Sequence, residues 1–170
     1  FFSALGGPCL AFPFDPNVLY DEAYDRFIIA ADGNGQSYCV GVSASSDPTG
    51  AYYLYDFSGV DVGGAFFDYP HAGVGRDAIY MGGNIFRCRG PFNCSFREAR
   101  VWAFDKVAMY DGQPADSVTV SLGNQPDSPQ PLNLHGWNQG TWPTSGPHYV
   151  FTNATYDGAN YNVYSWSDPF

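Results

Sequence analysis

The sequence predicts an all-β fold, namely a β-propeller segment of about three four-stranded antiparallel blades that is part of a larger propeller. One observation is the composition. Aromatic residues make up 18% of the chain, Gly and Pro together number 33 of 170, and charged residues are 14%. Tyr, Phe and Val favour half-buried strands, whereas Gly and Pro favour the turns between them. Long segments with helical periodicity are absent from the sequence, which favours strands.

The second observation is a pair of segments about 20 residues apart. In residues 45–55 a strand ends in an Asp47-Pro48-Thr49-Gly50 turn and an aromatic strand follows, whereas in residues 68–74 a short Pro turn opens the next strand. Pro48 presets the backbone for a tight turn, and Gly50 tolerates a positive φ. Together the segments indicate the outer hairpin of one blade and the crossing to the next.

Strand candidates divide the single domain, residues 1–170, into three blades. The first blade, 10–60, has strands at 17–20, 26–31, 37–43 and 51–57, with an acidic turn at 21–25. The second, 66–123, has strands at 71–75, 78–86, 99–108 and 118–122, with a helical turn near 105–109. Residues 124–131 are expected to form a long loop between blades. The third and incomplete blade, 131–170, has strands at 132–134, 148–154 and 160–167, and the Asp157-Gly158 pair predicts a hairpin.

Three blades are too few to close a propeller ring, since propellers have roughly four to eight blades. The end faces would then expose strand edges and apolar side chains such as Phe12, Phe14, Val163 and Trp166. We therefore expect the chain, which begins at Phe1 rather than Met, to be part of something longer. Its expected partners are further propeller sequence or copies of itself.

The charge balance limits the classes of partner. Seven basic and 17 acidic residues give a formal net charge of -10. Such a surface repels phosphate backbones, so nucleic acid is not an expected partner. No apolar run approaches the roughly 20 residues of a membrane span.

Four cysteines indicate an oxidising, secreted location. Four cysteines allow three pairings, and locality favours Cys9–Cys39 with Cys88–Cys94. Zinc is the alternative, but zinc ligand pairs usually lie about two to four residues apart, whereas five residues separate Cys88 from Cys94. Disulfides are typical of secreted or cell-surface proteins. Two sequons, at Asn93 and Asn153, are glycosylation candidates, and Asn153 is the better one because Cys94 is expected to be bridged.

A series of short motifs resembles the sequence pattern of a protein family. The motifs follow the order of that pattern from Gly6 to about Ala115, and the match is looser from there to Phe170. They are Gly6-Gly7-Pro8-Cys9, Asp15-Pro16-Asn17-Val18-Leu19-Tyr20-Asp21, Asp25-Arg26-Phe27, Tyr38-Cys39-Val40-Gly41-Val42-Ser43, Asp47-Pro48-Thr49-Gly50-Ala51-Tyr52-Tyr53, Asp68-Tyr69-Pro70-His71, Asp77-Ala78-Ile79-Tyr80-Met81, Asn84-Ile85-Phe86, Val101-Trp102-Ala103-Phe104-Asp105, Met109 and Gly112-Gln113-Pro114-Ala115. With these residues the chain resembles a group of secreted, largely uncharacterised β-propeller proteins known chiefly from bacterial genomes.

The resemblance implies an extracellular or surface-attached protein with a propeller longer than this chain. It also supports the Cys9–Cys39 bridge, whereas the Cys88–Cys94 loop is not part of the pattern. It brings no catalytic residues.

An enzymatic function would need a specific pair of carboxylates. A propeller glycosidase needs a protonated acid opposite a base or nucleophile, roughly 5–9.5 Å apart. Asp15 and Glu98 are the catalytic candidates for this alternative. Arg97 and Arg100 flank Glu98 and would lower the pKa of that carboxyl, which disfavours an acid role. Asp15-Pro16 is more typical of a turn.

Binding functions have two weaker sequence signals. Calcium is considered at Asp21, Asp25 and Asp32, or at Asp56 and Asp61, but the spacing matches no EF-hand loop, so no metal site is assigned. Aromatic residues with amide neighbours near the C-terminus suit carbohydrate stacking, and Trp137, Trp142 and Tyr156 are the candidates.

The sequence thus predicts a non-enzymatic extracellular or cell-surface propeller module with a structural, assembly or adhesive role, in which glycan binding is an option. The alternative is a propeller-type glycoside hydrolase acting on extracellular polysaccharide. No cofactor is expected.

Overall fold

The structure is a computed structural model and describes residues 1–58, 65–90, 93–124, 127–154 and 159–170. Strands dominate it, and the helices are short. The elements are η1 (Phe2–Leu5), α1 (Gly7–Ala11), β1 (Pro13–Asp21), β2 (Arg26–Gly33), β3 (Ser37–Ser43), β4 (Tyr52–Ser58), β5 (Ala65–Val74), β6 (Ala78–Cys88), β7 (Cys94–Asp105), α2 (Lys106–Tyr110), β8 (Ser117–Gly123), β9 (Asp127–Pro131), β10 (His148–Asn153) and β11 (Tyr161–Trp166).

The strands form three antiparallel sheets, each a meander in chain order. The first sheet is β1-β2-β3-β4, the second sheet is β5-β6-β7-β8, and the third sheet is β9-β10-β11. The all-β, antiparallel prediction is confirmed, and none of these sheets closes on itself within the described residues. Each sheet therefore has a first strand at one edge, namely β1, β5 or β9.

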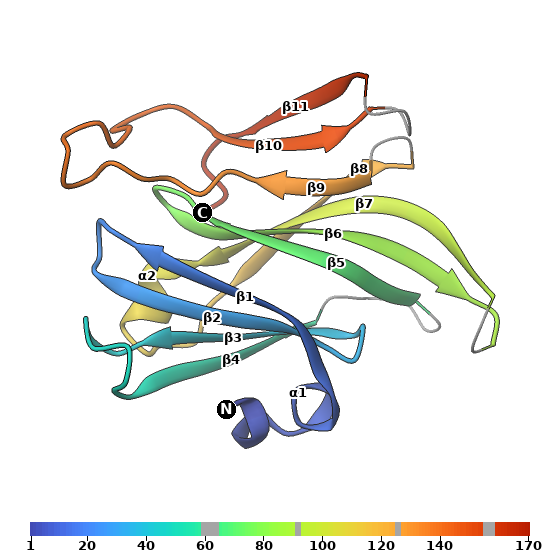
Figure 1. Ribbon diagram of the computed structural model, residues 1–170, viewed down its shortest axis with the longest axis horizontal. Coiled ribbons are helices and arrows are strands. Elements are labelled where there is room, and N and C mark those ends of the chain that lie inside the picture. The colour runs from blue at the N-terminus through green and yellow to red at the C-terminus, as the bar shows by residue number, and fades with distance from the viewer. Residues whose placement is uncertain (59–64, 91–92, 125–126, 155–158) are drawn as a thin grey trace.

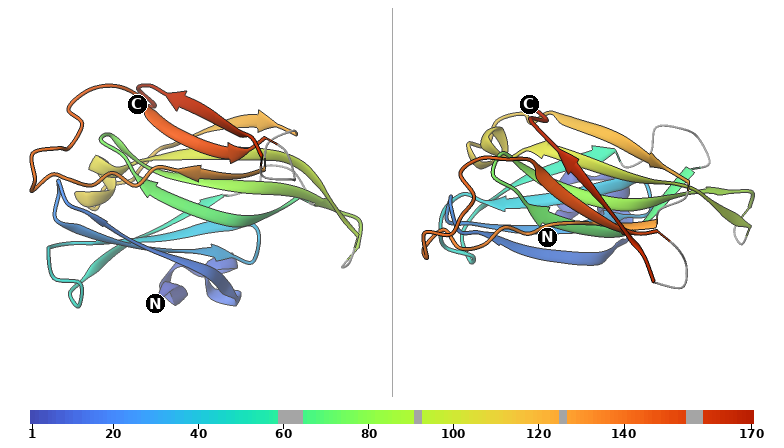
Figure 2. Two further views of the ribbon diagram at one scale, coloured as in Figure 1. Left: turned by 45° about the horizontal axis from the view of Figure 1, so that its top comes forward. Right: turned by 90° about the horizontal axis from the view of Figure 1, so that it is seen from above.

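The three sheets stack face to face, with the second sheet in the middle (Figures 1 and 2). The main core lies between the first and second sheets and includes Tyr38, Phe57, Phe67, Trp102 and Phe104. A smaller apolar cluster lies between the second and third sheets, where Trp166 packs against Tyr80. Alternating apolar residues on both faces of β6 explain why that strand is buried over most of its length.

The outer face of the first sheet is covered by the N-terminal segment. Phe2 and Cys9 are buried against Ala31 and Cys39 on this face. The Cys9–Cys39 disulfide forms with a Cα–Cα distance of 5.8 Å, and the Cys88–Cys94 disulfide forms with 4.0 Å. Both predicted pairings are confirmed.

The first strand of each sheet contains the same backbone bulge. In β1, β5 and β9 a residue with a left-handed backbone precedes a proline: Asp15 (φ 47°), Tyr69 (φ 57°) and Ser128 (φ 48°). The pairing register shifts at each of these three points. Proline has no N–H to donate and is therefore tolerated mainly on edge strands. All three bulges lie on such strands, which are paired along one edge only.

A polar side chain supports each bulge in the same way. The residue two positions after the left-handed one binds its carbonyl oxygen: Asn17 to Asp15 at 3.1 Å, His71 to Tyr69 at 3.0 Å, and Gln130 to Ser128 at 3.2 Å. The three sheets thus begin with one repeated structural unit.

Side-chain hydrogen bonds connect the first strands of the first and third sheets to the second sheet. The Asn17 amide donates to the Pro70 carbonyl at 3.2 Å and accepts from the Ala72 N–H at 3.2 Å. Asn84 in β6 binds both the N–H and the hydroxyl of Ser128 in β9. β1, β5 and β9 consequently follow one another along one side of the stack (Figure 1).

Two glycines let β9 pass directly over the second sheet. A Cβ atom at Gly82 would lie 2.1 Å from the Pro129 carbonyl oxygen, and one at Gly73 would lie 2.2 Å from that of Leu132. No side chain fits at such distances. Backbone therefore packs on backbone between the second and third sheets.

Two details of the sequence-based prediction are wrong. Residues 124–131 were expected to be a loop and 132–134 a strand, but the strand is β9, Asp127–Pro131. Three prolines and polar residues in this stretch suggest a loop, yet an edge strand needs few N–H donors. The Asp47–Gly50 turn does form, closed by Gly50 N–H to Asp47 O at 3.1 Å, but Gly50 is not in the left-handed region.

The close approach of β9 generates a first prediction. The Gly82→Ala substitution should lower the free energy of unfolding by about 1–3 kcal/mol, because overpacking against immovable backbone forces the third sheet away. The matched control is Gly83→Ala, whose Cβ would meet ordinary contacts at 3.5 Å or more. Urea unfolding followed by tryptophan fluorescence measures both, and equal losses in the two variants would contradict the packing argument.

Candidate functional site

The ammonium group of Lys106 lies fully buried where the three layers meet at one end of the stack. Its Nζ donates to Asp21 Oδ2 at 2.8 Å and to the Gly75 carbonyl at 2.6 Å. Asp21 also accepts from the Tyr110 hydroxyl at 2.9 Å. Asp21 ends β1 in the first sheet, Gly75 lies in the β5–β6 turn of the second, and Lys106 begins α2. The cluster therefore joins two sheets through one charged pair.

Local sequence explains how Lys106 reaches this position. Asp105 caps α2 by accepting hydrogen bonds from the N–H groups of Val107 and Ala108, each at 3.1 Å. The helix turns the chain inward directly after β7. Burial lowers the pKa of Lys106, and the Asp21 carboxylate opposes that shift. Burial also raises the pKa of Tyr110.

The long connection between β9 and β10 closes this end of the stack. Glu22 anchors it by accepting from the N–H groups of Gly136 at 2.9 Å and Trp137 at 3.0 Å, and it also contacts His135 Nδ1 at 3.1 Å. The His135 hydrogen bond is the main cause that lowers the pKa of Glu22. Trp142 from the same connection lies over Lys106, with 5.9 Å from Nζ to the ring centroid.

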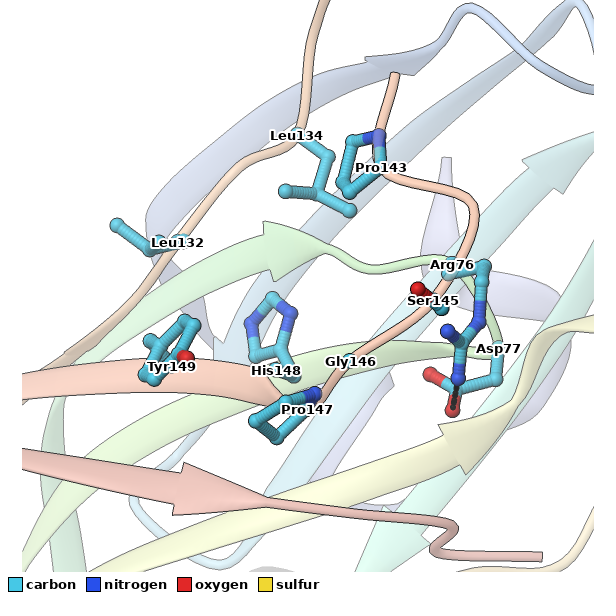
Figure 3. Close-up of a pocket in the computed structure, with 10 residues that line it drawn as sticks. All are labelled: Arg76, Asp77, Leu132, Leu134, Pro143, Ser145, Gly146, Pro147, His148 and Tyr149. Atoms are coloured by element: carbon cyan, nitrogen blue, oxygen red, sulfur yellow. Dashed lines mark ion pairs between the residues drawn. The ribbon is translucent and has the colours of Figure 1, made fainter.

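A cavity of about 280 Å³ lies beside this connection. Figure 3 shows Leu132, Leu134 and Pro143 on one side and the Arg76–Asp77 ion pair, 3.5 Å long, on the other. His148 and Tyr149 line it from the start of β10. Its walls are largely apolar with a charged rim, which suits a small, amphipathic ligand.

His148 is the least expected group at this cavity. Its ring stacks on Tyr80 with 3.8 Å between centroids, and both ring nitrogens are buried without a hydrogen-bond partner in the described residues. Burial lowers the pKa of His148 to about 4. Because solvent does not reach the ring nitrogens, His148 acts here as a packing group and not as a proton carrier for the cavity.

Asp32 is a second buried ionisable group, at the opposite end of β2 from the Lys106 cluster. Its Oδ1 accepts from the Gly35 N–H at 2.5 Å, whereas its Oδ2 is buried without a hydrogen-bond partner among the described residues. Burial raises the pKa of Asp32 to about 7, and the charges of Asp68 and Asp15 add to the shift.

The two carboxylates of the hydrolase alternative lie on different sheets. Asp15 is the left-handed residue of the β1 bulge, and Glu98 lies on β7, the third strand of the second sheet. Glu98 accepts from Arg100 Nε at 2.9 Å and from the Ser121 hydroxyl at 2.6 Å. Because Arg100 and Ser121 already donate hydrogen bonds to the Glu98 carboxylate, this carboxylate is poorly placed to act as a proton donor.

The candidate residues for carbohydrate stacking and for glycosylation differ in their exposure to solvent. Trp137 and Trp142 are edge-to-face with ring centroids 6.0 Å apart, but Trp142 is 8% exposed, whereas Trp137 is 50% exposed and offers a free ring face. Tyr156 and the Asp157-Gly158 turn lie outside the described residues. Asn93 and Asn153 are exposed, and both stay glycosylation predictions.

The calcium candidates are dispersed. Asp21 and Asp32 are buried in the two arrangements given above, Asp25 binds the Tyr20 hydroxyl at 2.6 Å, and Asp56 is exposed on β4. Asp61 lies outside the described residues. Among the residues that the structure describes, no three acidic, His or Cys side chains are grouped for a metal ion.

Comparisons with known proteins found no match among family models, curated proteins or solved structures. No helix in the described part of the chain has the length and apolar character needed to cross a bilayer.

Sequence reasoning did not find the Lys106 cluster or the Glu22 anchor. Asp21 and Glu22 belong to an acidic run that is typical of a solvated turn, yet Asp21 is fully buried. One signal was available: Lys106 is the sole lysine of the chain and follows a buried strand directly.

The cluster generates a second prediction. The Lys106→Met substitution should cost about 3–5 kcal/mol, because it leaves the Asp21 carboxylate buried without its cation. The Lys106→Met/Asp21→Asn double variant should lose less than the single variant, since no charge stays buried. Chemical denaturation measures these two variants and the Asp21→Asn single variant, and a double variant that loses as much as the sum of the two single variants would show that the pair is not coupled.

Asp32 generates a third prediction about pH. Because its folded pKa of about 7 lies above the ordinary aspartate pKa of 3.8, its contribution to stability is complete below pH 4 and is lost as the pH rises through 7. Asp32→Asn keeps an oxygen for the Gly35 N–H but does not titrate. The melting temperature of this variant should therefore exceed that of the wild type by about 5–10 °C more at pH 8 than at pH 4.

The matched control is Asp56→Asn, which removes an exposed carboxylate from β4. Its melting temperature should follow that of the wild type at every pH. A constant difference between Asp32→Asn and the wild type from pH 4 to pH 8 would contradict the burial argument.

Proposed function

We propose that the chain is a non-enzymatic extracellular β-propeller module that serves assembly or adhesion. The observation that carries the proposal is an uncovered apolar face at one end of a stack of repeated sheets. Tyr149, Phe151, Tyr161 and Val163 share the outer face of the third sheet and are 42%, 38%, 68% and 55% exposed. Their register pairs Phe151 with Val163 across β10 and β11.

The repeated architecture supports a propeller. Each sheet is a meander that begins with the same left-handed residue and proline, and the first strands lie next to one another, as the inner strands of propeller blades do. Asp168 before Pro169 has the same left-handed backbone, with φ 47°, and is a fourth copy of this pair.

The uncovered face fits a further antiparallel sheet as its partner. The first and second sheets, and the second and third, already bury such faces against each other. A stripe of two tyrosines, a phenylalanine and a valine is neutral, in a chain of net charge -10, so apolar contact is available there without charge repulsion. Further propeller sequence or a second copy of the chain would provide the sheet.

An extracellular location is supported by the cysteines. All four are in disulfides, which persist in oxidising compartments. The exposed Trp137 ring offers one stacking face for a glycan, which supports the adhesive option.

Association generates a fourth prediction. The purified chain should self-associate in sedimentation velocity experiments, through a contact that exceeds about 1,000 Å² in total. Val163→Glu should weaken association by at least about tenfold, because it places a charge in the centre of the apolar stripe.

The matched control is Val107→Glu, a change of the same kind at an exposed position of α2. This variant should associate like the wild type. Weak interfaces form at roughly 100 µM protein. A wild-type chain that stays monomeric at about this concentration and melts cooperatively would overturn the assembly function.

A further inference from the structure

The hairpin of β6 and β7 concentrates the positive charge of an acidic chain. Four of the six arginines, namely Arg87, Arg89, Arg97 and Arg100, lie within residues 86–100, beside Glu98 as the one acidic residue. This stretch has a net charge of +3, and the chain total of -10 leaves -13 for the remainder. The field of the molecule therefore directs an anion to this hairpin and away from the rest of the surface.

The hairpin is long and braced at its end. β6 and β7 have 11 and 12 residues, the longest strands of the described structure, and their far ends reach beyond the other strands (Figure 1). Cys88 lies opposite Cys94 in the register and is bonded to it. Two positions further in along the register, Phe86 and Phe96 meet edge to face with centroids 5.8 Å apart. Side chains on this hairpin are therefore held on a rigid support.

A cavity of about 290 Å³ lies against the hairpin. Its walls combine apolar groups with guanidinium groups, and they are formed by Ala65, Ile85, Phe86, Arg87, Arg97, Glu98 and Arg100. The register places Ile85 opposite Glu98 and Phe86 opposite Phe96, so Arg97 is the extra residue of a bulge. Bulges re-aim side chains, and this one brings Arg97 to the wall that Arg87 also lines.

The arginines that line the cavity differ in whether a carboxylate already binds their guanidinium group. Glu98 holds Arg100 through hydrogen bonds to Nε and Nη2. Arg87 and Arg97 are exposed, and in the described part of the chain neither has a carboxylate within ion-pair distance. Two arginines without a counter-ion therefore line a cavity that also has an apolar wall.

We propose that this cavity binds a carboxylate-bearing sugar residue of an acidic polysaccharide. Guanidinium groups bind carboxylates with paired, charge-assisted hydrogen bonds. The apolar part of the wall, which includes Ala65 and Ile85, suits the C–H face of a pyranose, whose hydroxyl groups can stay in water at the rim. The cavity is at the small end of ligand sites, which fits one sugar residue and not a long segment.

The charge of the remainder favours this ligand over a dense polyanion. A nucleic acid or a heavily sulfated chain carries its charge along its whole length and would be repelled by the -13 of the body. A polysaccharide whose sugar units carry at most one carboxylate each, without phosphate or sulfate groups, has a lower charge density and places a single anion in the cavity at lower cost.

The test is titration calorimetry of the wild-type chain with trigalacturonic acid, at 50 mM and at 300 mM salt. We expect binding at low salt and weaker binding at high salt, because the contact includes exposed ion pairs. The Arg87→Gln/Arg97→Gln variant should bind at least about tenfold more weakly, since the charge-assisted hydrogen bonds to the carboxylate are lost.

Arg89→Gln is the matched control, because it removes the same charge from the same hairpin but not from the cavity wall. The affinity of Arg89→Gln for trigalacturonic acid should lie within about twofold of the wild-type affinity. Four results overturn the proposal: no binding of trigalacturonic acid at 10 mM, an equal loss in Arg89→Gln and the double variant, equal affinity for galactotriose, or equal affinity for a tetraglutamate peptide. The last of these would assign the surface to acidic peptides instead. Circular dichroism melts confirm that each variant is folded.

Discussion

The buried ammonium group of Lys106 is the interaction on which the arrangement of the layers depends. It is held by a carboxylate from the first sheet and a carbonyl from the second, and Trp142 from the β9–β10 connection lies over it. A charge removed from water must keep all its partners, because losing one costs several kcal/mol. The position of α2, the end of β1 and the β5–β6 turn are therefore fixed relative to one another.

The second and third sheets are held together by a close contact that involves no buried charge. There the contact is between backbones, permitted by Gly73 and Gly82, and the side chains on either side are small or flat. Such a contact has little tolerance for added volume but no charge to satisfy. The stack thus combines one polar junction, which sets orientation, with one close backbone junction, which sets spacing.

Local features of the sequence were sufficient for most strands, the Asp47–Gly50 turn and the Cys88–Cys94 disulfide, because strand alternation and a cysteine separation of 6 act over a few residues. The Cys9–Cys39 pairing, with a separation of 30, followed from pairing the two remaining cysteines. Local features were insufficient where tertiary contacts decide. β9 contains Pro129 and Pro131 and was expected to be a loop, but it is an edge strand. Asp21 was expected in a solvated acidic turn, and its burial depends on Lys106, 85 residues away in the sequence. The glycosidase candidates Asp15 and Glu98 lie on separate sheets, which the spacing of residues along a chain does not reveal.

The two ends of the stack differ, and this difference limits what an assembly can become. The N-terminal segment, fastened by Cys9–Cys39, covers the outer face of the first sheet, whereas the outer face of the third sheet is uncovered. If association uses only the outer face of the third sheet, a subunit cannot add neighbours in both directions. Two copies that meet through their third sheets would be related by a two-fold axis and would leave no adhesive face, so growth would stop at a dimer instead of continuing into a fibre.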